Sequence, residues 1–265
     1  MRILLTGASG FLGHYLADEL RRRGLLFVTG GRTGCDVRLD LADPDSLPSA
    51  VREAHADLVI HAAALASLAA CEADRARADA VNHRAAQRLA ESAGGRLAFV
   101  STDLVFDGTA PPYASEASPA PLGVYARSKA DAEEAVRAAG GLVVRVPILF
   151  GPSFDGRRGA TDMIRSAAAP LALFTNEHRT PLHAADAARG IVELALARSG
   201  PATLHLAGPE RVSRFELGRR FLAASGLVGV RLEPVECDDP LRPRDVSLVP
   251  DWDCGRSLDA ALAES

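Results

Sequence analysis

Near its amino end the chain carries the segment Ile3-Leu4-Leu5-Thr6-Gly7-Ala8-Ser9-Gly10-Phe11-Leu12-Gly13. The apolar run that opens this segment is typical of a buried β-strand, and the apolar positions that follow it recur at helical spacing. The glycines therefore lie where a strand turns directly into a helix. In such a turn Gly7 allows the sharp bend, Gly10 lets the backbone approach a pyrophosphate, and Gly13 permits close packing of helix on strand. This placement predicts a dinucleotide-binding turn with the phosphates at the helix N-terminus.

Short apolar runs continue to alternate with helical patterns along the first part of the chain. Strands are expected at Ile3–Thr6, Leu25–Thr29, Val37–Leu41, Leu58–Ala62, Leu97–Ser101 and Leu142–Val146. Helices are expected after the glycine turn, over Ser46–Ala56 and Ala73–Ser92, and around Tyr125 and Lys129. Apolar strands that alternate with helices predict an α/β fold of Rossmann type, a doubly wound parallel sheet covered on both faces.

Beyond Pro147 the pattern becomes less regular. We expect a helix over Thr161–Ala168, a strand over Leu171–Phe174, a helix over His183–Arg198, and a helix that begins at a Ser213-x-x-Glu216 capping box and runs to Ala224. The tail, rich in proline and aspartate, is expected to wrap the surface. We therefore divide the chain into a Rossmann domain, 1–150 with 182–206 packed back onto it, and a smaller C-terminal α+β substrate-binding part, 151–181 and 207–265.

Composition places the chain among ordinary globular proteins. Its 265 residues are 48% hydrophobic and 24% charged, with a net charge of -4, so neither a nucleic-acid surface nor a basic membrane anchor is indicated. No apolar stretch approaches the roughly 18 residues of a membrane span. The four scattered cysteines and seven histidines show no metal-binding spacing. We expect a cytoplasmic protein with reduced thiols, a small-molecule substrate and no metal.

The end of the second expected strand indicates which nicotinamide cofactor is bound. An acid there binds the ribose hydroxyls of NAD, whereas an arginine accommodates the 2′-phosphate of NADP. Thr29-Gly30-Gly31-Arg32-Thr33 has no acid and one arginine, which favours NADP over NAD; a merely solvated role for Arg32 is the alternative. Asp40, at the end of the third strand, is placed to accept a hydrogen bond from the adenine amino group. Ala62-Ala63-Ala64 offers a path of small residues for the cofactor.

Lys129 is the only lysine in the chain, and Tyr125 precedes it by four residues. In a helix these two positions share a face, so a phenol would lie beside an ammonium. A neighbouring positive charge lowers the pKa of a phenol from its usual value of about 10. The pair therefore predicts a proton-transfer device, although the same spacing also occurs by chance in helices.

Three motifs resemble those of the extended short-chain dehydrogenase/reductases: the turn Thr6–Gly13, His61-Ala62-Ala63-Ala64, and Tyr125-Ala126-Arg127-Ser128-Lys129. Within that superfamily the chain resembles the dTDP-4-dehydrorhamnose reductase group in particular, through Val81-Asn82, Ser101–Gly108 and Pro121–Tyr125. Fainter similarities lie at Arg179-Thr180-Pro181 and Arg242–Leu248. The resemblance implies NADPH-dependent reduction of a ketone to an alcohol, with a 4-keto sugar nucleotide as substrate, and assembly as a homodimer.

The resemblance also implies roles for individual residues. Thr102 would hydrogen-bond the substrate carbonyl oxygen, Tyr125 would donate the proton, and Lys129 would bind the nicotinamide ribose and depress the pKa of the tyrosine. Asn82 matches the position that holds the active-site helix and a water, with a buried turn amide as the alternative. Independently, carbonyl reduction leaves alkoxide character on the oxygen, which needs one donor to orient it and one acid to protonate it.

The expected site residues fall into three groups. The catalytic residues are Thr102, Tyr125, Lys129 and Asn82. The cofactor-binding residues are Gly7, Ser9, Gly10, Phe11, Leu12, Gly13, Arg32, Asp40, Leu41, Ala62, Ala63, Ala64, Tyr125, Lys129 and Pro147. The substrate-binding residues are Asp103, Leu104, Ile148 and Arg179.

The residue after Asp103 separates reduction from elimination. Related sugar-nucleotide dehydratases carry Thr-Asp-Glu where this chain has Thr102-Asp103-Leu104, and elimination without the second carboxylate lacks its base. The rhamnose-forming relatives, however, generally have Tyr in place of Leu104 and Trp in place of Ile148, so the sugar side departs from their pattern. Two alternatives stay open: an NADP-binding regulatory subunit without turnover, and an NAD-dependent sugar-nucleotide epimerase.

Overall fold

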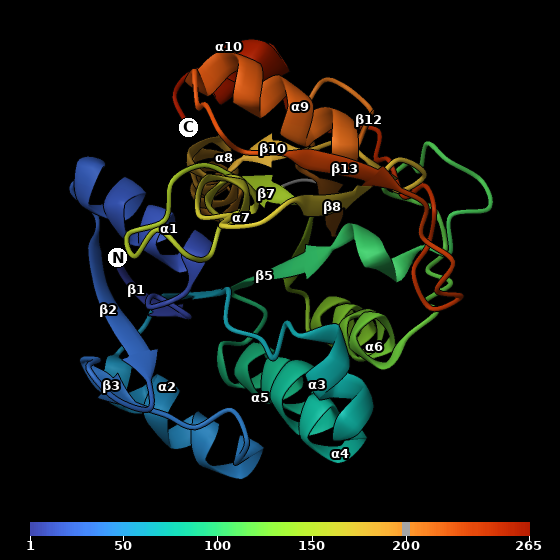
Figure 1. The fold of residues 1–265 in the computed structure, drawn as a ribbon. Coiled ribbons are helices and arrows are strands. Elements are labelled where there is room, and N and C mark those ends of the chain that lie inside the picture. Colours follow the sequence, from blue (N-terminus) through green and yellow to red (C-terminus); the bar gives the residue numbers. More distant parts are fainter. Residues whose placement is uncertain (198–201) are drawn as a thin grey trace.

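The computed structural model describes residues 1–197 and 202–265 and contains one central seven-stranded sheet (Figure 1). Its strand order is β11-β6-β5-β4-β1-β2-β3, and every neighbouring pair is parallel. The strands are β1 (Arg2–Thr6), β2 (Leu26–Gly31), β3 (Val37–Arg38), β4 (Leu58–His61), β5 (Leu97–Thr102), β6 (Leu142–Val146) and β11 (Thr203–His205). The predicted Rossmann-type fold class is confirmed.

Helices cover both faces of this sheet (Figure 1). On one face Leu16 and Leu20 of α1 (Phe11–Arg22) pack with Ile191 of α8 (Ala184–Ala197) against the apolar side chains of β1, β4, β5 and β6. On the other face α2 (Leu47–Ala54), α5 (Ala85–Ser92) and α6 (Val124–Ala138) cover the sheet, with Leu89 and Val136 among their fully buried residues. Because both faces are apolar, the strands are continuous hydrophobic runs without alternation.

The helix predicted over Ala73–Ser92 is confirmed from Arg75 on, where α4 (Arg75–Ala78), a π-helical turn η2 (Asp79–Arg84) and α5 follow one another without a break. Only its start differs, because Ala73 ends a separate helix, α3 (Leu68–Ala73). The break between α3 and α4 falls at Asp74, whose carboxylate accepts a hydrogen bond from the Arg77 amide at 2.9 Å and so caps a new helix. An aspartate can do this inside a helical pattern, because its short side chain competes for backbone donors.

The third strand is also shorter than predicted. It ends at Arg38, and a 3₁₀ turn, η1 (Pro44–Ser46), leads into α2. Asp40 therefore lies beyond the strand and not at its end, where its carboxylate accepts a hydrogen bond from the Ala42 amide at 3.0 Å.

The C-terminal part forms small paired strands and short helices beside the carboxyl edge of the sheet. The pairs are β7 (Leu149–Phe150) with β10 (Leu182–His183), β9 (His178–Arg179) with β12 (Val212–Ser213), and β8 (Leu171–Phe174) with β13 (Leu232–Val235). The helices are α7 (Ala160–Arg165), α9 (Arg214–Ser225) and α10 (Leu258–Leu262). The Ser213 hydroxyl caps α9 as predicted, accepting from the Glu216 amide at 3.0 Å. Arg198, the expected last residue of the helix after His183, lies outside the described residues.

The prediction that the tail only wraps the surface is wrong. Val246 and Leu248 are buried in an apolar cluster with Phe106 and Tyr113, and Tyr113 bridges the backbone of Leu248. The side chain of Leu262 in α10 is also fully buried. Proline and aspartate in this segment obscured apolar residues that the tail contributes to the interior. Within the described ranges, none of the helices has the length and apolar character needed to cross a membrane.

Candidate active site

The glycine turn joins β1 to α1 at the carboxyl edge of the sheet. Gly7 has a φ of +81°, and a Cβ there would lie 2.7 Å from the Ala63 backbone nitrogen. A Cβ on Gly13 would lie 1.8 Å from the carbonyl oxygen of Gly7. Because Gly7 and Gly13 have no side chains, the first turn of α1 packs directly against the Gly7 backbone, and the backbone of Ala62 and Ala63 lies beside Gly7. The α1 N-terminus has no side-chain cap and no acid in its first turn, so its free amides fit a phosphate group.

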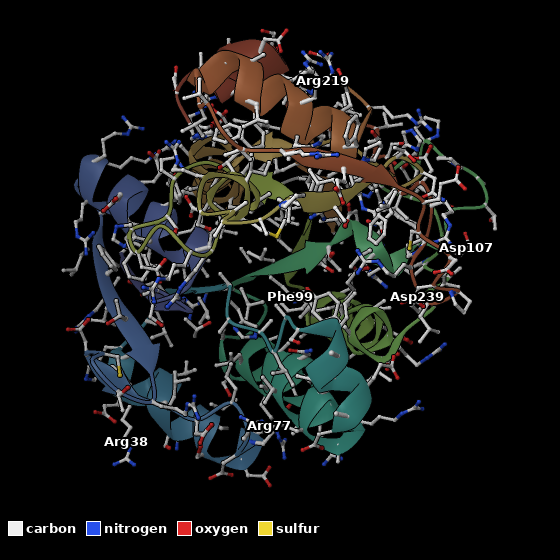
Figure 2. The ribbon with its side chains drawn as sticks, in the orientation of Figure 1. Arg38, Arg77, Phe99, Asp107, Arg219 and Asp239 are labelled. Atoms are coloured by element: carbon white, nitrogen blue, oxygen red, sulfur yellow. The ribbon has the colours of Figure 1, made fainter. Side chains whose placement is uncertain are left out.

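The residues expected to select the cofactor lie along the neighbouring edge. Arg32 follows β2 and is exposed, and within the described part of the chain no hydrogen bond or ion pair holds its guanidinium. Arg38, which the sequence reading did not single out, is a second exposed arginine; it ends β3 in register with Gly31 and lies at the outer edge of the sheet (Figure 2). Asp40 is exposed, and Leu41 packs against the core.

The expected catalytic residues converge at the ends of β5 and α6. Thr102 is the last residue of β5, Tyr125 lies in the first turn of α6, and both line the same cavity. Thr102 also accepts a hydrogen bond from the Leu104 amide at 3.2 Å and donates to an Asp103 carboxylate oxygen at 3.2 Å. Strand and helix therefore present two hydroxyls at one point.

Lys129 lies one turn along α6 from Tyr125 and is only 2% exposed. Its Nζ donates to the Val100 carbonyl of β5 at 2.7 Å and lies 3.8 Å from the ring centre of Phe99, which Figure 2 labels near the middle of the molecule. Burial lowers the pKa of Lys129 to about 7, against the opposing charge of Glu133. Burial therefore disfavours the charged form of this amine.

The expected depression of the tyrosine pKa is wrong for the cofactor-free protein. Burial raises the pKa of Tyr125, and the charges of Asp103 and Cys71 raise it further, while the neighbouring Thr102 hydroxyl acts in the opposite direction. Desolvation opposes formation of a phenolate, and the ammonium of Lys129 is bound to the sheet instead of the phenol. Spacing alone shows a shared helix face but not how deeply that face is buried.

A buried ion pair lies beneath Lys129. Glu133, the next turn of α6, is fully buried and accepts hydrogen bonds from Nη2 of Arg145 at 2.7 Å and from the Ser101 hydroxyl at 2.6 Å. Arg145 on β6 is 1% exposed, donates to the Ser115 carbonyl at 3.1 Å, and lies over the ring of Phe106. Through the bonds to Ser101 and Arg145, Glu133 joins α6 to β5 and β6 next to the expected catalytic residues.

Asn82 lies in the π-helical turn η2 and is 1% exposed. Its side-chain oxygen accepts from the Leu65 amide at 2.8 Å, and its amide donates to the Ser128 hydroxyl at 3.0 Å. Ser128 in turn donates to the Tyr125 carbonyl at 2.8 Å. Asn82 therefore links the loop after β4 to the first turn of α6. The structure thus gives it contacts suited to positioning that helix, and its catalytic role stays a prediction.

A cavity of about 760 Å³ lies next to the two hydroxyls. Its lining brings together all four residues expected on the substrate side, Asp103, Leu104, Ile148 and Arg179, together with Thr102, Tyr125 and Pro147. The C-terminal part supplies further lining residues that the sequence reading did not assign, notably Arg214, Leu241 and Arg242. The cavity therefore lies between the sheet edge and the C-terminal part.

Charged side chains dominate one wall of this cavity. Asp103 is 3% exposed; burial raises its pKa to about 6, partly offset by Arg179, whose Nε lies 3.3 Å from Oδ2. Arg242 pairs with the buried carboxylate of Glu177 at 2.6 Å. Arg214 lies between these pairs, and within residues 1–197 and 202–265 its guanidinium has neither a hydrogen bond nor an ion pair. Three guanidiniums in this region therefore share two carboxylates, Asp103 and Glu177, and Arg214 interacts with both without a direct ion pair.

Sequence reasoning missed Arg214, although one signal was present. The residue occupies the first position of α9, where the helix dipole disfavours a cation. A basic residue in that position therefore calls for an explanation other than helix stability. Among the described residues, no group of histidine, cysteine, aspartate and glutamate side chains is arranged to hold a metal ion.

Comparison with known proteins gives consistent matches. The family model described as the RmlD substrate binding domain matches residues 1–247. Methionine adenosyltransferase 2 subunit beta of Pongo abelii is 30% identical, over 96% of this chain and 81% of that protein. The dTDP-4-dehydrorhamnose reductase of Mycobacterium tuberculosis is 34% identical, over 91% of this chain and 81% of that protein. The solved dTDP-4-dehydrorhamnose reductase of Bacillus anthracis, in complex with NADP, shares the fold with a TM-score of 0.84 at 24% identity, over 99% and 96% of the two chains.

Proposed function

Because the chain belongs to the RmlD substrate binding domain family, we propose that it is an NADPH-dependent reductase of a 4-keto sugar nucleotide. The predicted resemblance to the extended short-chain dehydrogenase/reductases and to the dTDP-4-dehydrorhamnose reductase group is confirmed. The observation that carries the proposal is that the two hydroxyl-bearing residues Thr102 and Tyr125 line one cavity of about 760 Å³.

These residues can perform the protein's share of a carbonyl reduction. When bound, the reduced nicotinamide supplies the hydride. The Thr102 hydroxyl donates a hydrogen bond to the carbonyl oxygen and orients it, and the Tyr125 phenol transfers its proton as that oxygen becomes basic. The raised pKa of Tyr125 suits this direction, because the phenol keeps its proton near neutral pH until a stronger base forms.

Cofactor binding is assigned to the glycine turn and its neighbours. Gly7 and Gly13 let the turn pack closely against Ala63 and α1, and the uncapped amides at the N-terminus of α1 are available to a pyrophosphate. The free guanidinium of Arg32 supports a preference for NADP over NAD. We assign residues 1–150 and 182–206 to cofactor binding, and 151–181 and 207–265 to substrate binding.

The charge of the cavity supports a phosphorylated substrate. Arg179 and Arg242 form direct ion pairs with Asp103 and Glu177, and the half-buried Arg214 interacts with the same two carboxylates without a direct ion pair in the described residues. The diphosphate of a sugar nucleotide would supply the additional negative charge. The opposite wall contains Leu104 and Ile148, whose apolar side chains suit the less polar face of a deoxygenated sugar ring.

A panel of keto sugar nucleotides tests the proposal. We expect wild type to consume NADPH, followed by its absorbance, with at least one member of the panel. Tyr125→Phe should lose turnover by about a thousandfold or more while it still binds NADPH, because only the acid is removed. Wild type that binds NADPH but reduces no member of the panel would overturn the proposal.

A second candidate is an NADP-binding regulatory subunit without turnover. The similarity to methionine adenosyltransferase 2 subunit beta over 96% of this chain favours it. Co-expression with a methionine adenosyltransferase catalytic subunit, followed by gel filtration, would show a stable complex if this function is correct. The epimerase alternative predicts that the purified protein retains tightly bound oxidised cofactor, which its absorbance and mass would reveal.

We further propose a cytoplasmic location and a homodimer. All four cysteines are free thiols, which suits a reducing compartment. Sedimentation equilibrium over a concentration series would measure the oligomeric state; a monomer at every concentration would exclude the dimer.

A further inference from the structure

The segment Pro152–Arg158, which connects β7 to α7, crosses the N-terminal half of α1. In Figure 1 it is the yellow-green loop that extends from β7 toward α1. The Tyr15 hydroxyl of α1 donates to the Pro152 carbonyl at 2.6 Å, and the ring of Phe154 stacks on His14 with 5.0 Å between ring centres. The loop is therefore attached to the helix that begins at the glycine turn.

Hydrogen bonds within the loop hold its shape. The Asp162 carboxylate in α7 accepts from the backbone amides of Ser153 at 3.0 Å and Gly159 at 3.1 Å. The Ser153 hydroxyl accepts from the Arg157 amide at 3.0 Å. Asp162 is 1% exposed, so the loop is fixed from its buried end. Its position over α1 is thus determined by several independent contacts.

Arg158 is directed at the glycine turn itself. Its Nη1 donates to the Ser9 carbonyl at 2.6 Å, while its Nε pairs with Asp155 at 2.8 Å. The backbone of the next residue, Gly159, lies against Phe11, where a Cβ would be 3.2 Å from the ring. Ser9 and Phe11 flank the amides at which a pyrophosphate would bind. A guanidinium therefore lies beside the phosphate site, contributed by a segment about 150 residues away in sequence.

A pyrophosphate bound at the glycine turn would need a cation from outside the turn. Thr6–Gly13 contains neither lysine nor arginine, and a helix N-terminus contributes only about half a positive charge, whereas a pyrophosphate carries two negative charges. A guanidinium offers several donors in a fixed plane, which suits phosphate oxygens. If Nη1 of Arg158 bound a phosphate oxygen in place of the Ser9 carbonyl oxygen, this nitrogen would exchange a neutral acceptor for a charged one.

We propose that Arg158 is a cofactor-binding residue and that Pro152–Arg158 straps the pyrophosphate of the bound dinucleotide against the glycine turn. This inference rests on the proposed dinucleotide binding but concerns a different group of the cofactor from Arg32. Arg32 reads the 2′-phosphate, whereas Arg158 contacts the part that NADP and NAD share. The two arginines therefore make separable contributions to affinity.

Titration calorimetry without substrate tests the inference with NADPH, NADH and adenosine 2′-monophosphate, which lacks a pyrophosphate. Arg158→Ala should weaken NADPH and NADH alike, by about tenfold or more, and change adenosine 2′-monophosphate less than about twofold. Arg32→Ala should weaken NADPH and adenosine 2′-monophosphate but not NADH. Arg157→Ala is the matched control from the same loop, because its side chain makes no contact with the turn, and it should bind like wild type.

Three outcomes separate the possibilities. Wild type that binds neither NADPH nor NADH would overturn the proposed function and the strap with it. Wild type that binds both, with Arg158→Ala binding equally tightly, would overturn the strap alone. Equal weakening of all three ligands by Arg158→Ala would indicate collapse of the loop and also overturn a pyrophosphate contact; Arg158→Lys, which keeps the charge, should recover part of the affinity if the contact is real.

Discussion

Replacement of Glu133 by glutamine should destabilise the protein strongly. The substitution keeps the shape of the side chain but removes the charge that Arg145 contacts through two nitrogens, at 2.7 Å and 3.0 Å. Arg145 is 1% exposed, and its other partners, the Ser115 carbonyl and His205, are neutral. Loss of one partner of a buried ion pair leaves an uncompensated charge and costs about 3–5 kcal/mol. For a chain of this length that corresponds to a fall in Tm of roughly 6–10 °C.

Urea unfolding followed by circular dichroism measures this effect. Glu134→Gln, the adjacent exposed acid on α6, is the control and should stay within about 0.5 kcal/mol of wild type. The double variant Glu133→Met with Arg145→Met should recover much of the loss, because apolar residues of similar volume often replace a buried pair at little cost. A Glu133→Gln protein within about 1 kcal/mol of wild type would refute the reasoning.

Three further predictions concern the site. The pKa of Asp103 is raised to about 6 in the folded protein, against 3.8 in the unfolded chain. The folded state therefore binds the proton more tightly and loses stability as the pH rises between these two values. The difference in unfolding free energy between wild type and Asp103→Asn should shift against wild type by about 3 kcal/mol from pH 3 to pH 8, and a pH-independent difference would contradict this. Arg214→Ala should raise the KM for a sugar nucleotide by about tenfold or more, because the residue lines the cavity that contains Thr102 and Tyr125; an unchanged KM would remove it from substrate binding. Gly13→Ala should abolish NADPH binding in calorimetry, because the new Cβ would lie 1.8 Å from the Gly7 carbonyl oxygen, and tight binding by this variant would show that the turn adapts.

Local sequence was sufficient for the features that depend on local geometry. The glycine turn has a spacing that only a strand-to-helix connection explains, and Tyr125 and Lys129 share a helix face because of their separation alone. Conversely, the start of the helix expected over Ala73–Ser92 was placed too early, because a single aspartate, Asp74, ends one helix and caps the next. An aspartate can occupy either the interior or the N-cap of a helix, and the local sequence does not decide between these two positions.

Features that depend on distant segments could not be predicted. Arg158 reaches Ser9 only because the chain after β7 returns to α1, and Arg214 lines the cavity only because α9 begins beside it. The pKa of Tyr125 was predicted to be lowered, and this prediction was wrong for the same reason. The dominant cause of the shift is desolvation of the phenol in the folded protein, and a one-dimensional pattern contains no measure of desolvation.

Because Lys129 is the only lysine in the chain, its chemical reactivity reports local opening of the folded protein. Apart from the terminal amine of Met1, this is the single primary amine that the chain offers to an acylating reagent, and it is almost fully shielded. The rate at which the second acyl group is added, read from intact mass, therefore measures how often the interior beneath the two hydroxyls opens to solvent. No engineered label is needed for that measurement.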